Sequence, residues 1–327
     1  MTGLFDSFSR QICYMRISVT DHCNLRCIYC KAKSVPHLSR DDILSYEEIQ
    51  KVARAAAGLG IRALRLTGGE PLLRSELSRL VSMLVQIEGI EEIMLTTNGI
   101  LLGKYAFQLK EAGLKRVNIS LDSLDKEKFR YITGSNSLKD VLMGIEAARK
   151  ANLDPVKINM VVLKSINDNE VLDFARRSLD DAWNVRFIEY IPIGMQNNED
   201  TGLATIGEMM QTIEQSLGQL EPCWPKSGFG PAKYYRLPGA EGTLGFIGAM
   251  SDCFCERCSR LRLTADGALM PCLLDDAELD IKQALRSGAI IDELQKLIEV
   301  ATAMKKERHH LLESIYSNRR QMWQIGG

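Results

Sequence analysis

The 327-residue sequence contains no apolar run approaching the roughly 18 residues that a membrane-spanning helix needs. It also has no low-complexity tract and no long run of like charges. Its formal net charge of −1 argues against a surface that coats nucleic acid or another polyanion. Asp6 and Arg10 interrupt the short apolar patch at the start, so this segment does not resemble a secretory signal. We therefore expect a cytoplasmic protein with no membrane or nucleic-acid partner.

Cysteine, in contrast, is plentiful, with nine residues in the chain. Disulfides are rare in the cytosol, so this number points to metal or redox chemistry instead. The apolar fraction of 45% is sufficient for a substantial core. The length allows either one large domain or two ordinary ones.

Apolar, β-branched segments alternate with amphipathic helical segments over the first two thirds of the chain. This alternation predicts parallel βα units, and six strands are too few for a closed eight-stranded barrel. We therefore expect a partial (β/α)6 TIM-like barrel in an α/β fold, with ligands at the carboxyl ends of the strands. A doubly wound sheet is the alternative, since periodicity does not separate the two. The predicted strands are Tyr14–Val19, Ala63–Thr67, Glu92–Thr96, Arg116–Leu121, Val156–Val162 and Val185–Ile191, and the helical segments include Tyr46–Ala57, Ser75–Ile87, Leu138–Ala151 and Asn169–Leu179.

The character of the sequence changes after about residue 215. The segment 221–231 is rich in proline and glycine and reads as a linker or an ordered loop. Short strand-like pieces, four cysteines and two helices near 278–287 and 290–304 follow it. We therefore predict a barrel core over residues 1–215 and a C-terminal extension over residues 216–327.

A first cysteine group, Cys23, Cys27 and Cys30, follows the first predicted strand with the spacing C-x3-C-x2-C. Three thiolates so close in sequence face one point if their loop curls around a soft metal or an iron–sulfur cluster. Three ligands would leave one iron of a [4Fe–4S] cluster open. The alternatives are a zinc knuckle that lacks its fourth ligand, or buried inert thiols. One βα unit later, Thr67-Gly-Gly-Glu-Pro71 lets the backbone approach a ligand and offers Glu70 as an acceptor.

A second cysteine group, Cys255, Cys258 and Cys272, has the spacing C-x2-C-x13-C. Asp266-Gly267 predicts a hairpin turn that would bring Cys272 back beside Cys258. Cys253 could add a fourth thiolate and complete a structural zinc site, so this alternative stays open.

Several cations stand in or near the predicted strands. A charge on an otherwise apolar strand is costly to bury unless it has a partner. Each cation could pair with a structural carboxylate or point to solvent, and together they could bind an anionic ligand. They are Arg16, Arg65, Lys157, Arg260 and Arg262.

The first cysteine group, with Tyr29 just before its last cysteine and a GGEP turn one unit later, resembles the radical S-adenosylmethionine (SAM) superfamily. The resemblance implies that the open iron chelates the amino and carboxylate groups of SAM. It also implies that the reduced cluster cleaves SAM to methionine and a 5′-deoxyadenosyl radical. The GGEP turn would hold the methionine amine of SAM.

Further segments narrow the resemblance to the GTP 3′,8-cyclase family of molybdenum cofactor biosynthesis (the MoaA family). This resemblance implies two [4Fe–4S] clusters and SAM as cofactors, with the second cluster in the C-terminal extension binding the guanine base of GTP through its open iron. Cys13, Cys223 and Cys253 would then not be ligands. The similar segments are RISVTDHCNLRCIYC, LRLTGGEPLLR, LTTNG, VNISLDSLD, VKINMVVLKSIND, RFIEYIPIG, FCERCSRLRLTADGALMPCL and Gly326-Gly327.

The family pattern also implies roles for individual residues. The implied metal ligands are the two cysteine groups, and the first group is counted as catalytic with Arg260, Arg262, Gly326 and Gly327. The implied GTP contacts are Arg16, Arg65, Thr96, Lys157, Arg260, Leu261 and Arg262. The implied SAM contacts are Tyr29, Gly68, Gly69, Glu70, Ser120 and Ile191.

The implied reaction is a lyase-type radical cyclisation. Hydrogen abstraction from ribose C3′ of GTP and attack on guanine C8 would give 3′,8-cyclo-7,8-dihydro-GTP. The implied partners are a low-potential electron donor and the downstream cyclic pyranopterin monophosphate synthase, with the chain acting as a monomer or a homodimer. The sequence departs from the usual pattern of the family at His22, Lys31, Ala32, Ala63 and Ser259, and none of these departures removes a predicted ligand or phosphate-binding cation.

Two other functions remain open. A peptide-modifying radical SAM enzyme would use the second cysteine group for a fully ligated electron-transfer cluster and would need no cluster of cations. A zinc-stabilised nucleotide-binding regulator would contain zinc and no iron.

Overall fold

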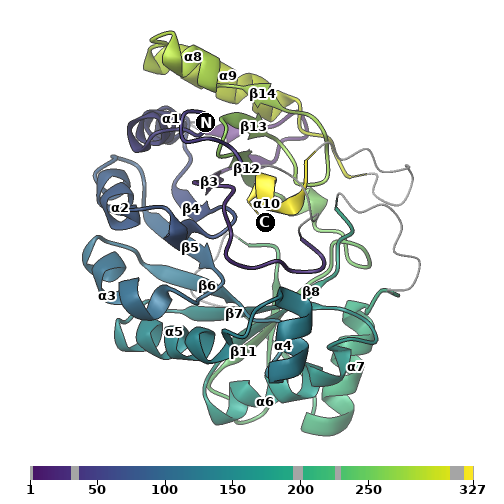
Figure 1. Cartoon of the computed structure of the whole chain (residues 1–327). Coiled ribbons are helices and arrows are strands. Elements are labelled where there is room, and N and C mark those ends of the chain that lie inside the picture. The colour runs from purple at the N-terminus through teal and green to yellow at the C-terminus, as the bar shows by residue number, and fades with distance from the viewer. Residues whose placement is uncertain (1–2, 31–36, 194–201, 225–229, 310–319, 327) are drawn as a thin grey trace.

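The computed structural model describes residues 3–30, 37–193, 202–224, 230–309 and 320–326. Figure 1 shows a strongly curved sheet with α1, α2, α3 and α5 along its outside and the short helix α10 near the middle of the curve. Within the described residues this sheet has 12 strands, in the order β14-β13-β12-β3-β4-β5-β6-β7-β8-β11-β10-β9. No helix in these residues has the length and apolarity needed to cross a bilayer.

Six consecutive parallel strands form the centre of the sheet and confirm the predicted barrel core. They follow one another in chain order, whereas a doubly wound sheet would reverse its order at a switch point. The structure therefore has the predicted partial barrel. The strands are β3 (Tyr14–Ser18), β4 (Ala63–Thr67), β5 (Glu92–Thr97), β6 (Arg116–Ser120), β7 (Val156–Val162) and β8 (Asn184–Glu189).

The C-terminal part of the chain adds strands to both edges of this core. One parallel strand, β12 (Arg260–Leu263), lies beside β3, and another, β11 (Thr243–Ile247), lies beside β8. The sheet therefore continues through the C-terminal extension, and the boundary after residue 215 stays a prediction. Antiparallel strands finish the two edges: β13 (Ala268–Met270) and β14 (Leu279–Asp280) on one side, β10 (Lys233–Arg236) and β9 (Glu221–Cys223) on the other. A separate two-stranded ribbon pairs β1 (Leu4–Phe5) with β2 (Gln11–Ile12).

The helices begin and end where the local sequence supplies caps. Ser45 forms a reciprocal capping box with Glu48 at the start of α1 (Tyr46–Gly58). The predicted hairpin is also present, with Gly267 at φ +86° between β12 and β13. The other helices are α2 (Leu77–Val85), α3 (Leu102–Glu111), α4 (Lys126–Thr133), α5 (Leu138–Lys150), α6 (Val171–Asp180), α7 (Ile206–Leu217), α8 (Lys282–Arg286), α9 (Ile291–Ala303) and α10 (Met322–Ile325), with short 3-10 turns η1 (Pro71–Leu73), η2 (Asp168–Glu170) and η3 (Cys255–Arg257).

The alternation of side chains along each strand separates an apolar layer from a polar interior. Met15 and Ile17 of β3 belong to the main hydrophobic core, together with apolar residues of the surrounding helices. The alternate residues face the inside of the barrel, because successive side chains of a strand point to opposite faces. The register aligns Arg16 with Arg65 on one side and with Arg262 on the other. Three arginines from neighbouring strands therefore share the inner face.

Candidate active site

A cavity of about 470 Å³ opens on the inside of the barrel. Basic residues from strands far apart in the sequence line it, together with the aromatic rings of Tyr234 and Tyr235. Five of the basic residues occupy inward-facing strand positions in the pairing register, namely Arg65, Arg116, Lys157, Arg186 and Arg260, whereas Arg257 lies in η3. We call this region the cationic cavity, and its basic residues are Arg65, Arg116, Lys157, Arg186, Lys233, Arg257 and Arg260.

The positive charge of this cavity is largely uncompensated by carboxylates of the residues that the structure describes. Arg116 forms an ion pair with Glu92 at 2.5 Å. For Arg65, Lys157 and Arg186, no carboxylate of the described residues lies within ion-pair distance, although each is less than a tenth exposed. Buried cations without counter-ions are costly, so a fold that keeps several together favours an anionic ligand.

The pKa values show the same crowding. Burial, together with the nearby charges of Arg65, Arg260 and Arg186, lowers the pKa of Arg16 to about 10. Burial, followed by repulsion from Arg16 and Arg260, lowers the pKa of Arg262 well below its usual value. Binding an anion would relieve this repulsion, because an opposite charge favours the protonated form of a base.

Neutral hydroxyls orient the cations without neutralising them. The Lys157 ammonium donates to the hydroxyl of Tyr234 at 2.9 Å, and the Arg65 guanidinium donates to the hydroxyl of Tyr14 at 2.5 Å. Arg65 also contacts the hydroxyl of Thr96 at 3.5 Å. The structure therefore brings the predicted substrate contacts Arg65 and Thr96 together on the adjoining strands β4 and β5, and Lys157 of β7 lines the same cavity as Arg65.

The C-terminal segment reaches into the barrel beside this cavity. The carbonyl oxygen of Gly326 accepts hydrogen bonds from Arg16 and Arg262, each at 3.2 Å. Gly326 has φ +80°, and a Cβ at this position would lie 2.8 Å from the side chain of Thr67 and 3.0 Å from that of Ser18. Glycine is therefore required for this approach. Gly327 lies outside the described residues.

The loop that carries the first cysteine group is held against α4. The backbone amide of Arg26 donates to the carbonyl of Thr133 at 2.8 Å, and that of Ile28 donates to the carbonyl of Ile132 at 2.9 Å. None of the three cysteines is in a disulfide, and all three are partly buried. Burial raises the pKa of Cys27, and the nearby Asp122, Cys30 and Cys23 raise it further. The three thiols are thus electrostatically coupled, and such an all-thiolate donor set fits an iron–sulfur cluster.

The GGEP turn packs tightly under this loop. A Cβ on Gly68 would lie 2.5 Å from the carbonyl oxygen of Thr20, and one on Gly69 would lie 2.2 Å from that of His22. The Glu70 carboxylate accepts from the amides of Leu72 and Asn98 at 3.0 and 2.7 Å and from the hydroxyl of Thr97 at 2.6 Å. Burial raises the pKa of Glu70 to about 7 against these hydrogen bonds. Glu70 therefore fixes the turn to the end of β5, and its contact with SAM stays a prediction.

Tyr29, the aromatic residue of the cysteine loop, donates its hydroxyl proton to Asp122 at 2.5 Å. The other carboxylate oxygen of Asp122 accepts from the amide of Val161 at 2.9 Å. Burial raises the pKa of Asp122 to about 6, although these two hydrogen bonds oppose the change. Asp122 thus connects the cysteine loop to the ends of β6 and β7.

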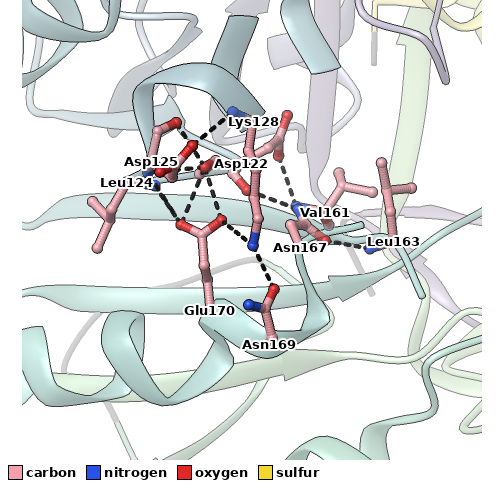
Figure 2. A network of polar contacts seen from close by, with 10 residues as sticks. Asp122, Leu124, Asp125, Lys128, Val161, Leu163, Asn167, Asn169 and Glu170 are labelled. Carbon is pink, nitrogen blue, oxygen red and sulfur yellow. Dashed lines mark hydrogen bonds and ion pairs between the residues drawn. The ribbon is translucent and has the colours of Figure 1, made fainter. Parts of the chain in front are cut away.

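A polar network supports Asp122 from behind (Figure 2). The Asn167 side chain donates to the carbonyls of Asp122 and Val161, at 2.7 and 2.9 Å. The Glu170 carboxylate accepts from Ser123 and from the amide of Leu124 at the start of α4. Because α4 holds the cysteine loop at its other end, this network fixes both the loop and the segment that follows Ser120.

The second cysteine group lies in a basic environment at the other edge of the core. Burial alone would raise the pKa of Cys258, but the charges of Arg260 and Lys305 lower it to about 6. Burial raises the pKa of Cys255 to about 12, and Cys253 and Cys272 contribute to the increase. Cys272 is therefore close enough to influence the pKa of Cys255, and its position beside Cys258 stays a prediction. This donor set also consists of thiols alone and fits a cluster.

The structure also shows where the remaining predicted residues lie. Ser120 ends β6, and Leu261 is a core residue of β12. Ile191 packs against a small cluster that contains Ile325, next to Gly326. Cys223 lines the cationic cavity, whereas Cys13 is buried and free.

Sequence reasoning did not find four residues of the site: Arg116, Arg186, Tyr234 and Asp122. Arg116 and Arg186 carry the signal that singled out Arg65, a charge on an otherwise apolar predicted strand. Arg186 donates to the side chain of Asn159 at 2.8 Å and interacts with Tyr234. Tyr234 lies in a segment with no motif, so only the fold brings it to the cavity.

The chain matches two protein families in succession. Residues 17–177 match the radical SAM superfamily, and residues 183–311 match the Molybdenum Cofactor Synthesis C family. A GTP 3′,8-cyclase from Moorella thermoacetica is 50% identical over 323 residues, covering 98% of this chain and 99% of the relative. One from Pelotomaculum thermopropionicum is 49% identical over 327 residues, with coverage of 98% and 99%.

The chain belongs to the GTP 3′,8-cyclase family of the radical SAM superfamily. Solved structures agree on the fold at much lower identity. Streptococcus suis SuiB bound to S-adenosylmethionine aligns with TM-score 0.61 at 12% identity, covering 92% of this chain and 77% of SuiB. The protein anSMEcpe with bound AdoMet aligns with TM-score 0.60 at 15% identity, covering 96% and 84%. This chain thus shares its fold with proteins whose sequences differ widely from its own.

Proposed function

We propose that this chain binds GTP and SAM together and converts GTP to 3′,8-cyclo-7,8-dihydro-GTP in molybdenum cofactor biosynthesis. One observation supports this most directly: Arg65, Lys157 and Arg186 are buried on the inside of the barrel with no carboxylate partner in the described residues. GTP carries several negative charges near neutral pH, so its triphosphate would supply the missing counter-charge. Full-length identity to GTP 3′,8-cyclases supports the same substrate.

The two cysteine groups would hold the two [4Fe–4S] clusters, Cys23, Cys27 and Cys30 the first and the second group the other. When bound, the first cluster supplies the electron that cleaves SAM to a 5′-deoxyadenosyl radical, and the second offers an open iron to the guanine base. The protein's own part is positioning and exclusion of water, because the cofactors supply the difficult chemistry.

Each part of the barrel interior has a positioning task in this proposal. Arg65, Lys157 and Arg186 would hold the triphosphate, with Thr96 and Tyr234 orienting these cations. The Gly68–Gly69 backbone and the Tyr29–Asp122 pair would hold SAM near the first cysteine group. Ribose C3′ would then lie between a fixed triphosphate and a fixed base.

The backbone at Gly326 would close the chamber between the two ligands. Arg16 and Arg262 donate hydrogen bonds to its carbonyl oxygen, so these arginines would bind the C-terminal segment as well as an anionic ligand. We propose that this arrangement excludes water from the reacting atoms.

The finer partners follow from the chemistry. Reductive cleavage of SAM needs a low-potential electron donor, and we propose such a donor in the cytoplasm, where thiolates stay reduced. The cyclic nucleotide would pass to cyclic pyranopterin monophosphate synthase. We propose that the chain works as a monomer or a homodimer and that residues 216–327 form the substrate-binding extension.

The deciding experiment is anaerobic reconstitution with iron and sulfide, followed by incubation with SAM, a low-potential reductant and one candidate substrate. Deoxyadenosine and cyclic nucleotide should form with GTP and not with ATP or a peptide library. Turnover with a peptide and none with GTP would instead identify a peptide-modifying enzyme. A chain that contains zinc and no iron after reconstitution would be a nucleotide-binding regulator.

A further inference from the structure

Cys253, which the proposed function leaves unused, lies beside Cys255 and His309. Their ligand atoms all lie within 4.8 Å of one another, and no other cysteine-containing group of this kind occurs in the described residues. The Sγ atom of Cys253 is 3.7 Å from Nε2 of His309. Cys253 comes from the loop before η3, Cys255 begins η3, and His309 lies more than fifty residues later in the chain.

These separations suit one metal ion. Zinc binds thiolate sulfur at about 2.3 Å and imidazole nitrogen at about 2.0 Å in a tetrahedral arrangement, which places the two donor atoms roughly 3.5 Å apart. The separation of 3.7 Å between Cys253 and His309 is close to this value. In a cubane, by contrast, each cysteine binds a different iron, so its thiolates are more widely spaced.

Arg10 holds the two segments of this group together. Its guanidinium donates to the carbonyl of Cys255 at 2.8 Å and to the carbonyls of Glu307 and Lys306 at 2.7 and 2.6 Å. Asp6 in turn fixes Arg10 through an ion pair at 2.6 Å. The approach of His309 to the cysteines is therefore built into the folded chain.

We propose that Cys253, Cys255 and His309 form a zinc site that is an alternative to the second iron–sulfur cluster. The two sites are alternatives because Cys255 belongs to both. The assignment of Cys255 to the second cluster rests on the proposed function. Two cysteines and one histidine are typical zinc ligands, with solvent in the fourth position. Zinc and the second cluster would therefore exclude each other in one chain.

The site is accessible to an ion from solvent. Cys253 is exposed, and Cys255 and His309 are partly buried. Nε2 of His309 also lies 3.0 Å from the carbonyl of Ala249, to which it donates in one tautomer. Metal binding would shift the ring hydrogen to Nδ1 and break this hydrogen bond, so Ala249 sets a modest energetic barrier to zinc.

Two single variants separate the two sites. The reconstituted full-length enzyme is exposed to air and a chelator to remove iron, and then titrated with zinc or with cobalt, whose thiolate charge-transfer absorption reports cysteine ligation. Cys253→Ser should keep the iron of both clusters during reconstitution yet bind zinc at least tenfold more weakly. Cys272→Ser should show the reverse, with the second cluster lost and zinc affinity retained. Cys223→Ser serves as the matched control, since Cys223 lies in neither group.

His309→Ala gives a second test that leaves every cysteine in place and should also weaken zinc binding at least tenfold. Zinc affinity that is unchanged in both Cys253→Ser and His309→Ala would overturn the proposal, as would loss of zinc binding in Cys272→Ser. Failure of the proposed function would be different: Cys272→Ser would retain as much iron as the unmodified chain. The two hypotheses therefore fail on different measurements, zinc affinity for one and iron content for the other.

Discussion

The two cysteine groups occupy oppositely charged surroundings. Beside the first group lie two buried carboxyl groups, Asp122 with a pKa of about 6 and Glu70 with a pKa of about 7. Around the second group lie Arg260, Arg262 and Lys305, and the charges of Arg260 and Lys305 lower the pKa of Cys258 to about 6 against the effect of burial. The inside of the barrel thus changes from acidic to basic between its two cysteine groups.

This difference matches the charges of the two ligands in the proposed function. SAM carries a positive sulfonium group, and GTP is a polyanion, so the same field attracts each ligand to its own end of the chamber. Repulsion from the wrong end would add to this discrimination, as specificity often depends on unfavourable contacts. Electrostatics would then keep the radical source and the substrate in a fixed order.

The largest effect is expected from removing a cation of the GTP end. Arg186→Leu should weaken GTP binding about 100-fold, because a buried charge-assisted hydrogen bond contributes roughly 1.5–3 kcal/mol. The affinity for SAM should change less than about twofold. Isothermal titration with each ligand measures both, and Arg176→Leu is the control, since Arg176 is exposed and paired with Asp173. Equal losses for GTP and SAM would show that the two ends are not electrostatically distinct.

The next effect concerns the backbone between the ends. Gly326→Ala should lower cyclic product formation about tenfold, because alanine at φ +80° costs about 1 kcal/mol and its Cβ would press on Thr67. Deoxyadenosine should still form, so uncoupled SAM cleavage should rise relative to product. Gly239→Ala is the matched control, with φ +78° and nothing within 4 Å of the added Cβ. A similar loss in both variants would assign the effect to backbone strain alone.

A smaller effect is expected at the acidic end. Asp122→Asn leaves one acceptor oxygen, whereas the hydroxyl of Tyr29 and the amide of Val161 each need one. Either Tyr29 or the backbone at Val161 therefore loses its hydrogen-bond acceptor. SAM affinity should fall about fivefold, consistent with roughly 1 kcal/mol for a hydrogen bond, while GTP affinity stays unchanged. Equilibrium dialysis with each ligand measures this, with the exposed Asp173→Asn as the control. A loss confined to GTP would reverse the assignment of the two ends.

The smallest effect is a shift in a thiol titration. In the cluster-free chain, alkylation of Cys258 should rise with pH around a midpoint near 6, because the folded state favours its thiolate. Its pKa lies below the usual value, so this contribution to stability is fully present above about pH 9 and is lost as the pH falls through 6. Arg260→Leu should raise the midpoint by about one pH unit. Mass spectrometry of alkylated peptides measures it, and an unchanged midpoint would remove Arg260 as the cause.

The barrel core could be predicted well from the sequence because short-range sequence patterns determine its strands and turns. Apolar β-branched runs such as Val156–Val162 form strands with the predicted bounds, and the Asp266–Gly267 turn forms its hairpin. The family resemblance also singled out Arg65, Lys157 and Gly326, and the structure places these three inside the barrel. Most of the fold could therefore be predicted from short-range patterns and long motifs.

Long-range pairing could not be predicted from the same patterns. No periodicity in Thr243–Ile247 or Arg260–Leu263 indicates that these strands extend opposite edges of the core, because register between distant segments depends on the whole sheet. Tyr234 reaches Lys157 only through that pairing. Likewise, the contact of Tyr29 with Asp122 joins residues 93 positions apart, and their separate motifs do not encode it.

The hydrogen bond from Arg16 to the carbonyl of Gly326 connects residues 310 positions apart in the chain. After β3 has left the ribosome, the chamber therefore cannot close until Gly326 has also been synthesised. During that interval the nascent protein would lack its barrier to solvent, so premature metal loading would leave a reactive centre open to oxygen. Cells that make this enzyme would benefit from inserting iron and sulfide only after translation ends.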